Sequence, residues 1–237
     1  MNIVAIGGGE LRSRETFEID TFIRDLSGKS APKVLFIPTA SNDAAGYCEV
    51  FSEVYGKELG CSVNDLRLMT QQPGKNEIED KLFNADVIYV GGGNTKNMLE
   101  VWEKNNLNTL LAQIADSGTI LSGLSAGAIC WFEKGHSDYE LFENENNWQY
   151  RFLNCLGFKS GIYCPHLNED SRLSDFAASL QQQKLNGIGC DNNAAIWYQN
   201  NNAKVITSSS EATVKVINTE LEQTTCKIYS AGETIHY

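Results

Sequence analysis

A serine with a glycine two positions before it and another two positions after it is the best candidate nucleophile of this sequence. Residues 119–132 read TILSGLSAGAICWF, so Ser125 lies between Gly123 and Gly127. An apolar strand, a sharp turn and the start of a helix fit this pattern, which is that of a nucleophile elbow. The turn forces the serine into a crowded backbone conformation, and small neighbours let strand and helix pass closely. The pattern predicts hydrolysis or acyl transfer, and the alternative is a turn that only packs.

A serine nucleophile needs a general base, and the sequence contains three histidines: His136, His166 and His236. His166 follows the apolar segment 161–165, so its imidazole is expected at the carboxyl end of a strand, where Ser125 also lies. His236 is the penultimate residue, and chain ends are usually mobile. His166 is therefore the predicted base.

The base needs an acid that fixes its tautomer and stabilises the imidazolium. Asp138 is the first choice, because it lies in a polar loop that can return from the elbow helix toward the nucleophile. Glu140 and Glu133 are alternatives in the same region. The acidic pair 169–170 is too close to His166 in sequence to reach its ring unless the loop folds sharply.

Backbone N–H groups are expected to stabilise the oxyanion of a tetrahedral intermediate. The N–H of Ala126, directly after the nucleophile, is one donor of the elbow scheme. Gly93, in the segment GGGNT, can supply the second, because glycine lets its backbone approach a substrate carbonyl closely. Asn94 is expected to cap the following helix and is a candidate for substrate binding.

Short apolar segments without alternation predict the strands that position these residues: 2–6, 33–37, 86–90, 119–121 and 187–190. Helical patterns lie between them, at 15–26, 44–59 and 95–116. The order predicts an α/β fold, a doubly wound, mostly parallel sheet with helices on both faces, in a single domain over residues 1–237. Further short strands predict an antiparallel extension at one sheet edge: 194–198, 203–207, 213–217 and 226–229.

Three glycine clusters follow predicted strands, at 7–9, at 91–93 and around Ser125. Loops at the carboxyl ends of strands line the functional crevice of such sheets, so the clusters are expected to converge. The first cluster is not a dinucleotide-binding fingerprint, because Arg12 stands where the third glycine would be.

Composition argues against several classes of function. A net charge of −11 repels phosphates, which argues against nucleic-acid binding. No basic leader and no run of about 18 apolar residues is present, so we expect no membrane association and a cytoplasmic location. The seven cysteines include no CxxC pair and are expected to be free and mostly buried. A metal site built on Cys130, Cys164 and His166 lacks ligand spacing, so neither metal nor cofactor is expected.

Five motifs in this order resemble the peptidase E (aspartyl dipeptidase) family of serine peptidases, which also includes cyanophycinase. They are GGGE at 7–10, YVGGGNT at 89–95, GLSAGA at 123–128, CPH at 164–166 and DNNAA at 191–195. The resemblance therefore spans most of the chain.

The resemblance implies a fold similar to class I glutamine amidotransferases and hydrolysis of short peptides that begin with aspartate. It makes Ser125 the nucleophile, His166 the base, and the N–H groups of Gly93 and Ala126 the oxyanion donors. Family members carry an acid in a loop after the elbow that begins with threonine. Asp138 matches that acid, although the preceding threonine is absent here, and some members use glutamate instead.

A substrate aspartate calls for a cation, ideally an arginine. Arg172 resembles the family's downstream arginine at a shorter spacing, and its alternative is an ion pair at a helix start. The expected partner is thus a short aspartyl peptide, and the acidic surface neither demands nor forbids a homodimer. Two other functions stay open, which are cyanophycinase-like hydrolysis of β-aspartyl peptides and a catalytically silent small-molecule-binding protein of the same fold.

Overall fold

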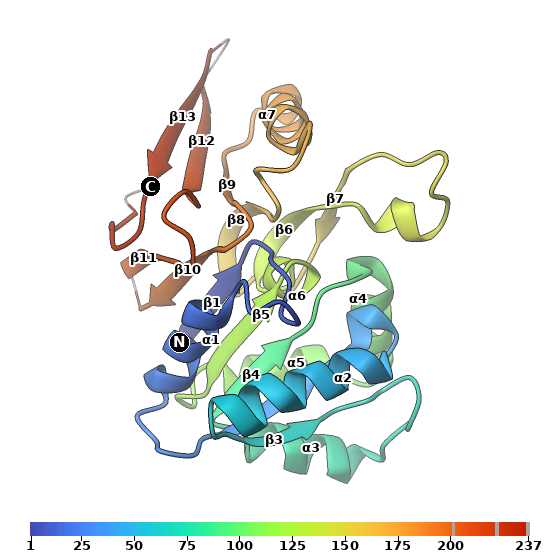
Figure 1. Cartoon of the computed structure of the whole chain (residues 1–237). Helices are drawn as coiled ribbons and strands as arrows, with labels where there is room; N and C mark the ends of the chain where they lie inside the picture. The colour runs from blue at the N-terminus through green and yellow to red at the C-terminus, as the bar shows by residue number, and fades with distance from the viewer. Residues whose placement is uncertain (201, 221–222, 236–237) are drawn as a thin grey trace.

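The computed structural model describes residues 1–200, 202–220 and 223–235, and these residues form a mixed α/β structure with two sheets (Figure 1). The first sheet has the strand order β11-β10-β1-β5-β4-β2-β3. Its strands are β1 (Asn2–Ile6), β2 (Lys33–Ile37), β3 (Ser62–Asp65), β4 (Val87–Val90), β5 (Ile120–Leu124), β10 (Ala194–Gln199) and β11 (Asn202–Thr207).

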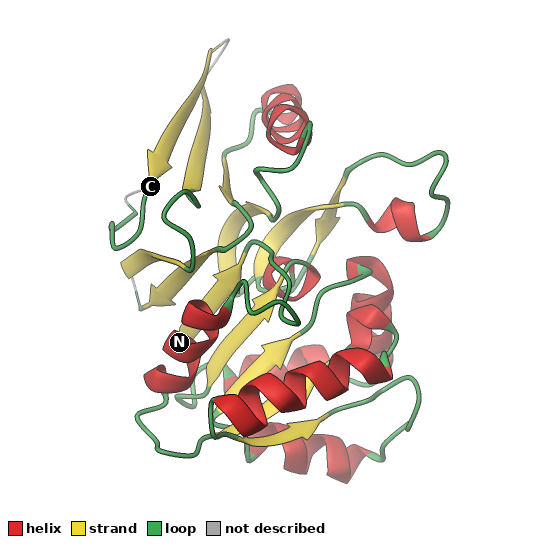
Figure 2. Ribbon diagram, viewed as in Figure 1, coloured by secondary structure: helices red, strands yellow, loops and turns green. Residues whose placement is uncertain are grey.

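The second sheet has the strand order β13-β12-β9-β8-β6-β7. Its strands are β6 (Phe132–Ser137), β7 (Arg151–Asn154), β8 (Lys159–Cys164), β9 (Gly187–Cys190), β12 (Val214–Glu220) and β13 (Gln223–Tyr229). The hairpin of β12 and β13 projects from the body of the molecule beside α7 (Figure 2).

The helices cover both faces of the first sheet. The α-helices are α1 (Phe17–Leu26), α2 (Ala45–Phe51), α3 (Lys75–Phe83), α4 (Thr95–Lys104), α5 (Leu107–Ile114), α6 (Ala126–Ile129) and α7 (Arg172–Gln183). Two short 3₁₀ segments, η1 (Thr39–Ser41) and η3 (Tyr139–Phe142), and one π-helical segment, η2 (Ser52–Glu58), complete the described helices.

Alternation within each strand explains the two layers of core. In β1, Ile3 and Ala5 pack with α3, α4 and α5, whereas Val4 and Ile6 pack with α1 and α2. Strands buried on both faces carry uninterrupted apolar runs, which is why their positions could be predicted from the sequence.

The predicted helices are present with two local departures. The segment 44–59 starts as α2 and continues as the π-helical η2. The segment 95–116 is broken between α4 and α5, where Asn106 takes the left-handed conformation with φ of 57°. Helix α5 still has an apolar buried face, because it begins at Leu107 and places its leucines and Ile114 on that face.

The prediction of one sheet was wrong. Of the predicted antiparallel extension, β10 and β11 do flank β1, but β12 and β13 belong to the second sheet. In that sheet β9 pairs in parallel with β8 and antiparallel with β12. The cause is the chain path after the elbow. The four-residue helix α6 leads directly into β6, and β6, β8 and β9 then pair in parallel with one another away from the first sheet.

Parallel pairing brings the carboxyl ends of three strands together. Ile6 of β1 is in register with Leu124 of β5, and Val90 of β4 with Gly123. The loops that follow these strands carry the three glycine clusters, so their predicted convergence is confirmed.

The cysteines are free thiols as predicted, and they are buried except at two positions, Cys155 and Cys226. Among the described residues, no helix is long and apolar enough to cross a membrane.

Candidate active site

Ser125 lies on the sharp turn between β5 and α6. Its backbone has φ of 54° and ψ of −111°, a conformation that non-glycine residues rarely adopt. A Cβ at Gly123 would overlap the carbonyl of Gly127, and a Cβ at Gly127 would overlap that of Val90. The two glycines therefore let strand and helix pass closely, which is the elbow geometry that the sequence predicts.

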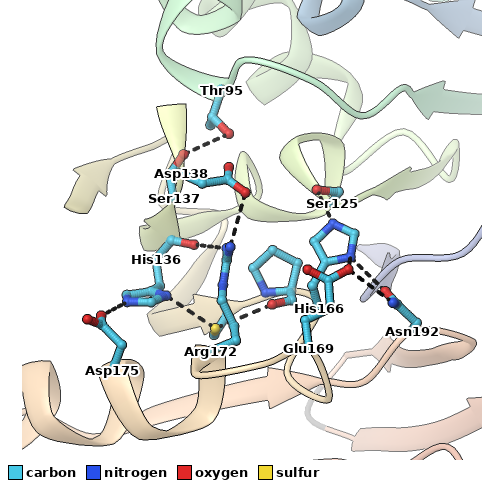
Figure 3. A network of polar contacts seen from close by, with 12 residues as sticks. Thr95, Ser125, His136, Ser137, Asp138, His166, Glu169, Arg172, Asp175 and Asn192 are labelled. Carbon is cyan, nitrogen blue, oxygen red and sulfur yellow. Dashed lines mark hydrogen bonds and ion pairs between the residues drawn. The ribbon is translucent and has the colours of Figure 1, made fainter. Parts of the chain in front are cut away.

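His166 directly faces this serine (Figure 3). Its Nε2 lies 2.8 Å from the Oγ of Ser125, within the range of proton transfer. The backbone holds this pose, because the N–H of His166 donates to the carbonyl of Gly7 at 3.1 Å and that of Ser125 donates to Ile6 at 3.0 Å. The structure thus brings together the predicted nucleophile and base.

Two side chains accept from the other ring nitrogen of His166. Its Nδ1 lies 2.6 Å from Oδ1 of Asn192 and 3.3 Å from Oε1 of Glu169. The Nδ2 of Asn192 donates to the same carboxylate at 3.2 Å. Because both Nδ1 partners are acceptors, the proton of the neutral ring lies on Nδ1, and Nε2 accepts the hydroxyl of Ser125.

The Glu169 carboxylate stays ionised in this arrangement. The hydrogen bond from His166 is the main cause that lowers the pKa of Glu169 to about 2. A negative charge is therefore present beside the imidazole and can stabilise its protonated form.

The prediction that Asp138 orients the base is wrong. Asp138 accepts a hydrogen bond from Arg172 at 3.1 Å. The alternatives are also occupied elsewhere, since Glu140 accepts from Arg151 at 2.7 Å and Glu133 from the backbone of Gly161 at 2.8 Å.

Glu169 reaches the imidazole because the loop after β8 folds back on itself. The N–H of Glu169 donates to the carbonyl of His166 at 3.0 Å, and His166 itself has φ of 53°. This is the sharp fold without which the acidic pair 169–170 could not reach the ring. Asn192 lies in the segment DNNAA, which is one of the motifs of the family resemblance. The sequence alone assigned no role to Asn192 itself.

Arg172 is not available to a substrate carboxylate. Only 1% of its side chain is exposed. It donates to Asp138 and, at 2.8 Å, to the carbonyl of His136, and its guanidinium lies over the ring of Tyr150. The predicted role in substrate binding is therefore corrected, and the alternative of an ion pair at a helix start describes the residue.

His136 belongs to the same buried cluster and not to the Ser125 pair. Its Nε2 lies 2.8 Å from Oδ1 of Asp175, and its Nδ1 lies 3.4 Å from Sγ of Cys164. Burial, followed by the charge of Arg172, lowers the pKa of His136 to about 4. The ring is neutral near pH 7. His236 lies outside the described residues.

One predicted oxyanion donor starts the helix after Ser125, and the other lies in the loop between β4 and α4. Ala126 is the first residue of α6, where N–H groups have no partner within the helix. Gly93 has φ of 138°, and a Cβ there would overlap the carbonyl of Ala40. Its neighbour Gly92 lies against the nucleophile, since a Cβ at Gly92 would be 3.6 Å from that of Ser125.

Asn94 caps α4 as predicted. Its side chain accepts the N–H of Asn97 at 3.0 Å, which satisfies one of the free donors of the helix start.

The first glycine cluster also shapes the site. A Cβ at Gly8 would overlap the Oδ1 of Asn192 and the imidazole of His166. Only glycine leaves room for this pair at the end of β1. Among the described residues, no group of three or more His, Cys, Asp or Glu side chains could hold a metal ion.

Comparison with known proteins agrees with this geometry. Residues 3–206 match the family model of peptidase family S51. The chain belongs to peptidase family S51. It is 33% identical over 201 residues to the uncharacterized peptidase YgaJ of Bacillus subtilis (strain 168), a match that covers 84% of this chain and 83% of YgaJ.

Two further proteins match this chain over a shorter stretch or at lower identity. Peptidase E of Haemophilus influenzae is 32% identical over 112 residues, which is 46% of this chain and 47% of that protein. The crystal structure of a peptidase from an acI-B1 Actinobacterium has the same fold, with a TM-score of 0.67 at 19% identity over 100% of this chain and 96% of that one. Family S51 membership and the geometry of Ser125 make the chain a peptidase of the serine type.

Proposed function

We propose that this S51 peptidase is an exopeptidase that hydrolyses short peptides through an acyl-enzyme on Ser125. The observation that carries the proposal is the 2.8 Å contact between Oγ of Ser125 and Nε2 of His166 on a strained elbow. A hydroxyl becomes a useful nucleophile at neutral pH when an adjacent base takes its proton during attack.

The residues of the site suit each step of this reaction. Oγ of Ser125 attacks the peptide carbonyl carbon while Nε2 of His166 takes the proton. The N–H groups of Gly93 and Ala126 stabilise the oxyanion. The imidazolium then gives its proton to the leaving amine, and the C–N bond breaks. Water, activated by the same imidazole, releases the acid and restores the serine.

Asn192 and Glu169 support the base throughout. The amide oxygen of Asn192 holds Nδ1–H, a role that asparagine also fills in papain-like Cys-His-Asn sites. The carboxylate of Glu169 adds the negative charge that a neutral amide lacks.

A preference for N-terminal aspartate is the finer part of the proposal, and it follows from the resemblance to peptidase E. It requires a cation near Ser125 other than Arg172, because Arg172 is buried and paired with Asp138.

The test is hydrolysis of Asp-Leu, Ala-Leu and β-aspartyl-leucine by the wild type and by Ser125→Ala. We expect Asp-Leu to be cleaved fastest and Ser125→Ala to lose at least about 10³-fold in kcat, as loss of a triad serine does. Ser174→Ala is the control, since its hydroxyl donates to a backbone carbonyl on the exposed side of α7. Cleavage of the β-linked peptide alone would favour the cyanophycinase-like alternative. No cleavage of any peptide would refute the proposal.

A further inference from the structure

A cavity of about 300 Å³ lies beside the nucleophile. Its wall includes Leu124, which directly precedes Ser125, and Gly92, which packs against the nucleophile. The loop after β1 also lines the cavity, from Gly9 to Arg12. Helix α2 contributes Gly46, Tyr47 and Val50 to the lining. A group bound there would therefore lie next to the reacting hydroxyl.

Arg12 is the cation of this cavity, and its guanidinium forms no ion pair with a carboxylate of the described residues. Every other arginine of the chain forms an ion pair with a carboxylate: Arg14, Arg24, Arg67, Arg151 and Arg172. The Nη2 of Arg12 lies 3.9 Å from the position that a Cβ would take at Gly46, so the guanidinium lies over the start of α2.

The backbone that carries Arg12 is fixed by its own hydrogen bonds. The N–H of Arg12 donates to Oε1 of Glu10 at 2.8 Å, and the N–H of Glu10 donates to Oε2 of Glu15 at 2.8 Å. Glu10 also lines the cavity, where its charge can face the amino group of a peptide. A free guanidinium on an ordered loop is preorganised to bind a carboxylate with two hydrogen bonds.

We propose that this cavity, the Arg12 pocket, binds a carboxylate of the peptide substrate through the guanidinium of Arg12. The inference rests on the proposed function, in that it names the charge that the peptide must carry. Two sources share this chemistry, which are the side chain of an N-terminal aspartate and the C-terminal carboxylate of a dipeptide. The pocket thus supplies the cation that Arg172 cannot.

The experiment measures binding without hydrolysis. Asp-Leu, Asp-Leu-amide, Ala-Leu and Ala-Leu-amide are titrated by calorimetry into Ser125→Ala, Ser125→Ala/Arg12→Gln and the control Ser125→Ala/Arg24→Gln. The guanidinium of Arg24 forms an ion pair with Asp25, and Arg24 does not line the pocket. Thermal melting of each variant verifies that it is folded.

We expect Arg12→Gln to weaken binding of Asp-Leu about 10- to 100-fold, the value of a charge-assisted hydrogen-bonded pair. Arg24→Gln should leave it unchanged. If the loss persists with Asp-Leu-amide and vanishes with Ala-Leu, the pocket binds the aspartate side chain. If it persists with Ala-Leu and vanishes with Asp-Leu-amide, the pocket binds the C-terminal carboxylate.

The proposal is overturned if Asp-Leu does not bind, if Arg12→Gln binds all four peptides as tightly as its parent, or if Ala-Leu-amide loses as much affinity as Asp-Leu. Failure of the proposed function would be seen elsewhere, as absence of hydrolysis by the wild type. The two outcomes are distinguishable because calorimetry does not require Ser125.

Discussion

At the scale of single residues, the unusual feature of the site is a neutral amide in the place where serine peptidases commonly have an acid. Asn192 lies closest to Nδ1 of His166, at 2.6 Å, and a carboxylate oxygen of Glu169 lies 3.3 Å from the same atom. The amide can fix the tautomer of the ring, and the carboxylate can stabilise its charge. The two functions of a triad acid are thereby divided between two side chains.

This division predicts different effects for substitutions of the two residues. Asn192→Ala should lower kcat about 10²- to 10⁴-fold, because the imidazole loses the acceptor that fixes its tautomer. Asn192→Asp restores an acceptor and should stay within about 10-fold of the wild type. Glu169→Gln should lower kcat less and move the acid limb of the pH–rate profile to lower pH, because the base loses a neighbouring negative charge that favours its protonated form.

Steady-state kinetics on Asp-Leu from pH 5 to 9 would test this division. A wild-type kcat in Asn192→Ala would contradict the assignment of the amide. An unchanged acid limb in Glu169→Gln would contradict that of the carboxylate.

At the scale of elements, the strands that apolar runs predicted are present, because burial on both faces of a strand produces such a run, whereas α3, β3, β6 and β7 were not predicted. Local sequence patterns also predicted the elbow, since Gly123 and Gly127 reflect a local steric need. The membership of β9 in a second sheet depends on pairing with β8, which no local pattern contains.

The partners of the base were missed for a related reason. Glu169 reaches His166 only through a turn with a positive φ at the histidine itself, and Asn192 arrives from a distant strand end. Glu169 looked unsuitable because only two residues separate it from His166 in the sequence. No feature of the sequence offered a reason to select an amide as the partner of the base.

The loop after β1 carries no reacting group, but Gly8 in this loop lies against the imidazole of His166. Gly8→Ala should lower kcat about 10²-fold, because its Cβ overlaps Asn192 and His166 and a displacement of about 1 Å is costly in a catalytic site. Gly74→Ala is the matched control, since a Cβ there meets nothing within 4 Å. Kinetics and urea unfolding of both variants would separate misplacement from loss of stability. Equal kcat in the two variants would show that the loop does not constrain the imidazole.

At the scale of the whole molecule, a buried polar cluster links the second sheet to α7. His136 on β6 contacts Cys164 on β8 and Asp175 on α7, and Arg172 at the start of α7 donates to the carbonyl of His136. Figure 3 shows this cluster beside the Ser125 pair but separate from it. The loop that carries His166 joins β8, which ends at Cys164, to α7, which starts at Arg172.

The cluster predicts how stability depends on pH. The pKa of His136 is lowered to about 4 in the folded chain, against about 6.5 in an unfolded one. The contribution of neutral His136 is therefore complete above pH 6.5 and is lost as the pH falls toward 4, because only the unfolded chain takes up the proton. By pH 5 the expected loss is about 2 kcal/mol, at about 1.4 kcal/mol per pKa unit.

Urea unfolding of the wild type and His136→Phe at pH 7.5 and pH 5 measures this contribution of His136 to the free energy of unfolding. The variant should lose less stability between the two pH values, whatever its absolute stability, because it lacks the titrating ring. Burial raises the pKa of Asp20 to about 7, which acts in the opposite direction, since that stabilising contribution is lost as the pH rises. Asp20 is present in both proteins, so its effect cancels in the comparison. An equal loss in both proteins would mean that His136 does not control the acid sensitivity of the fold.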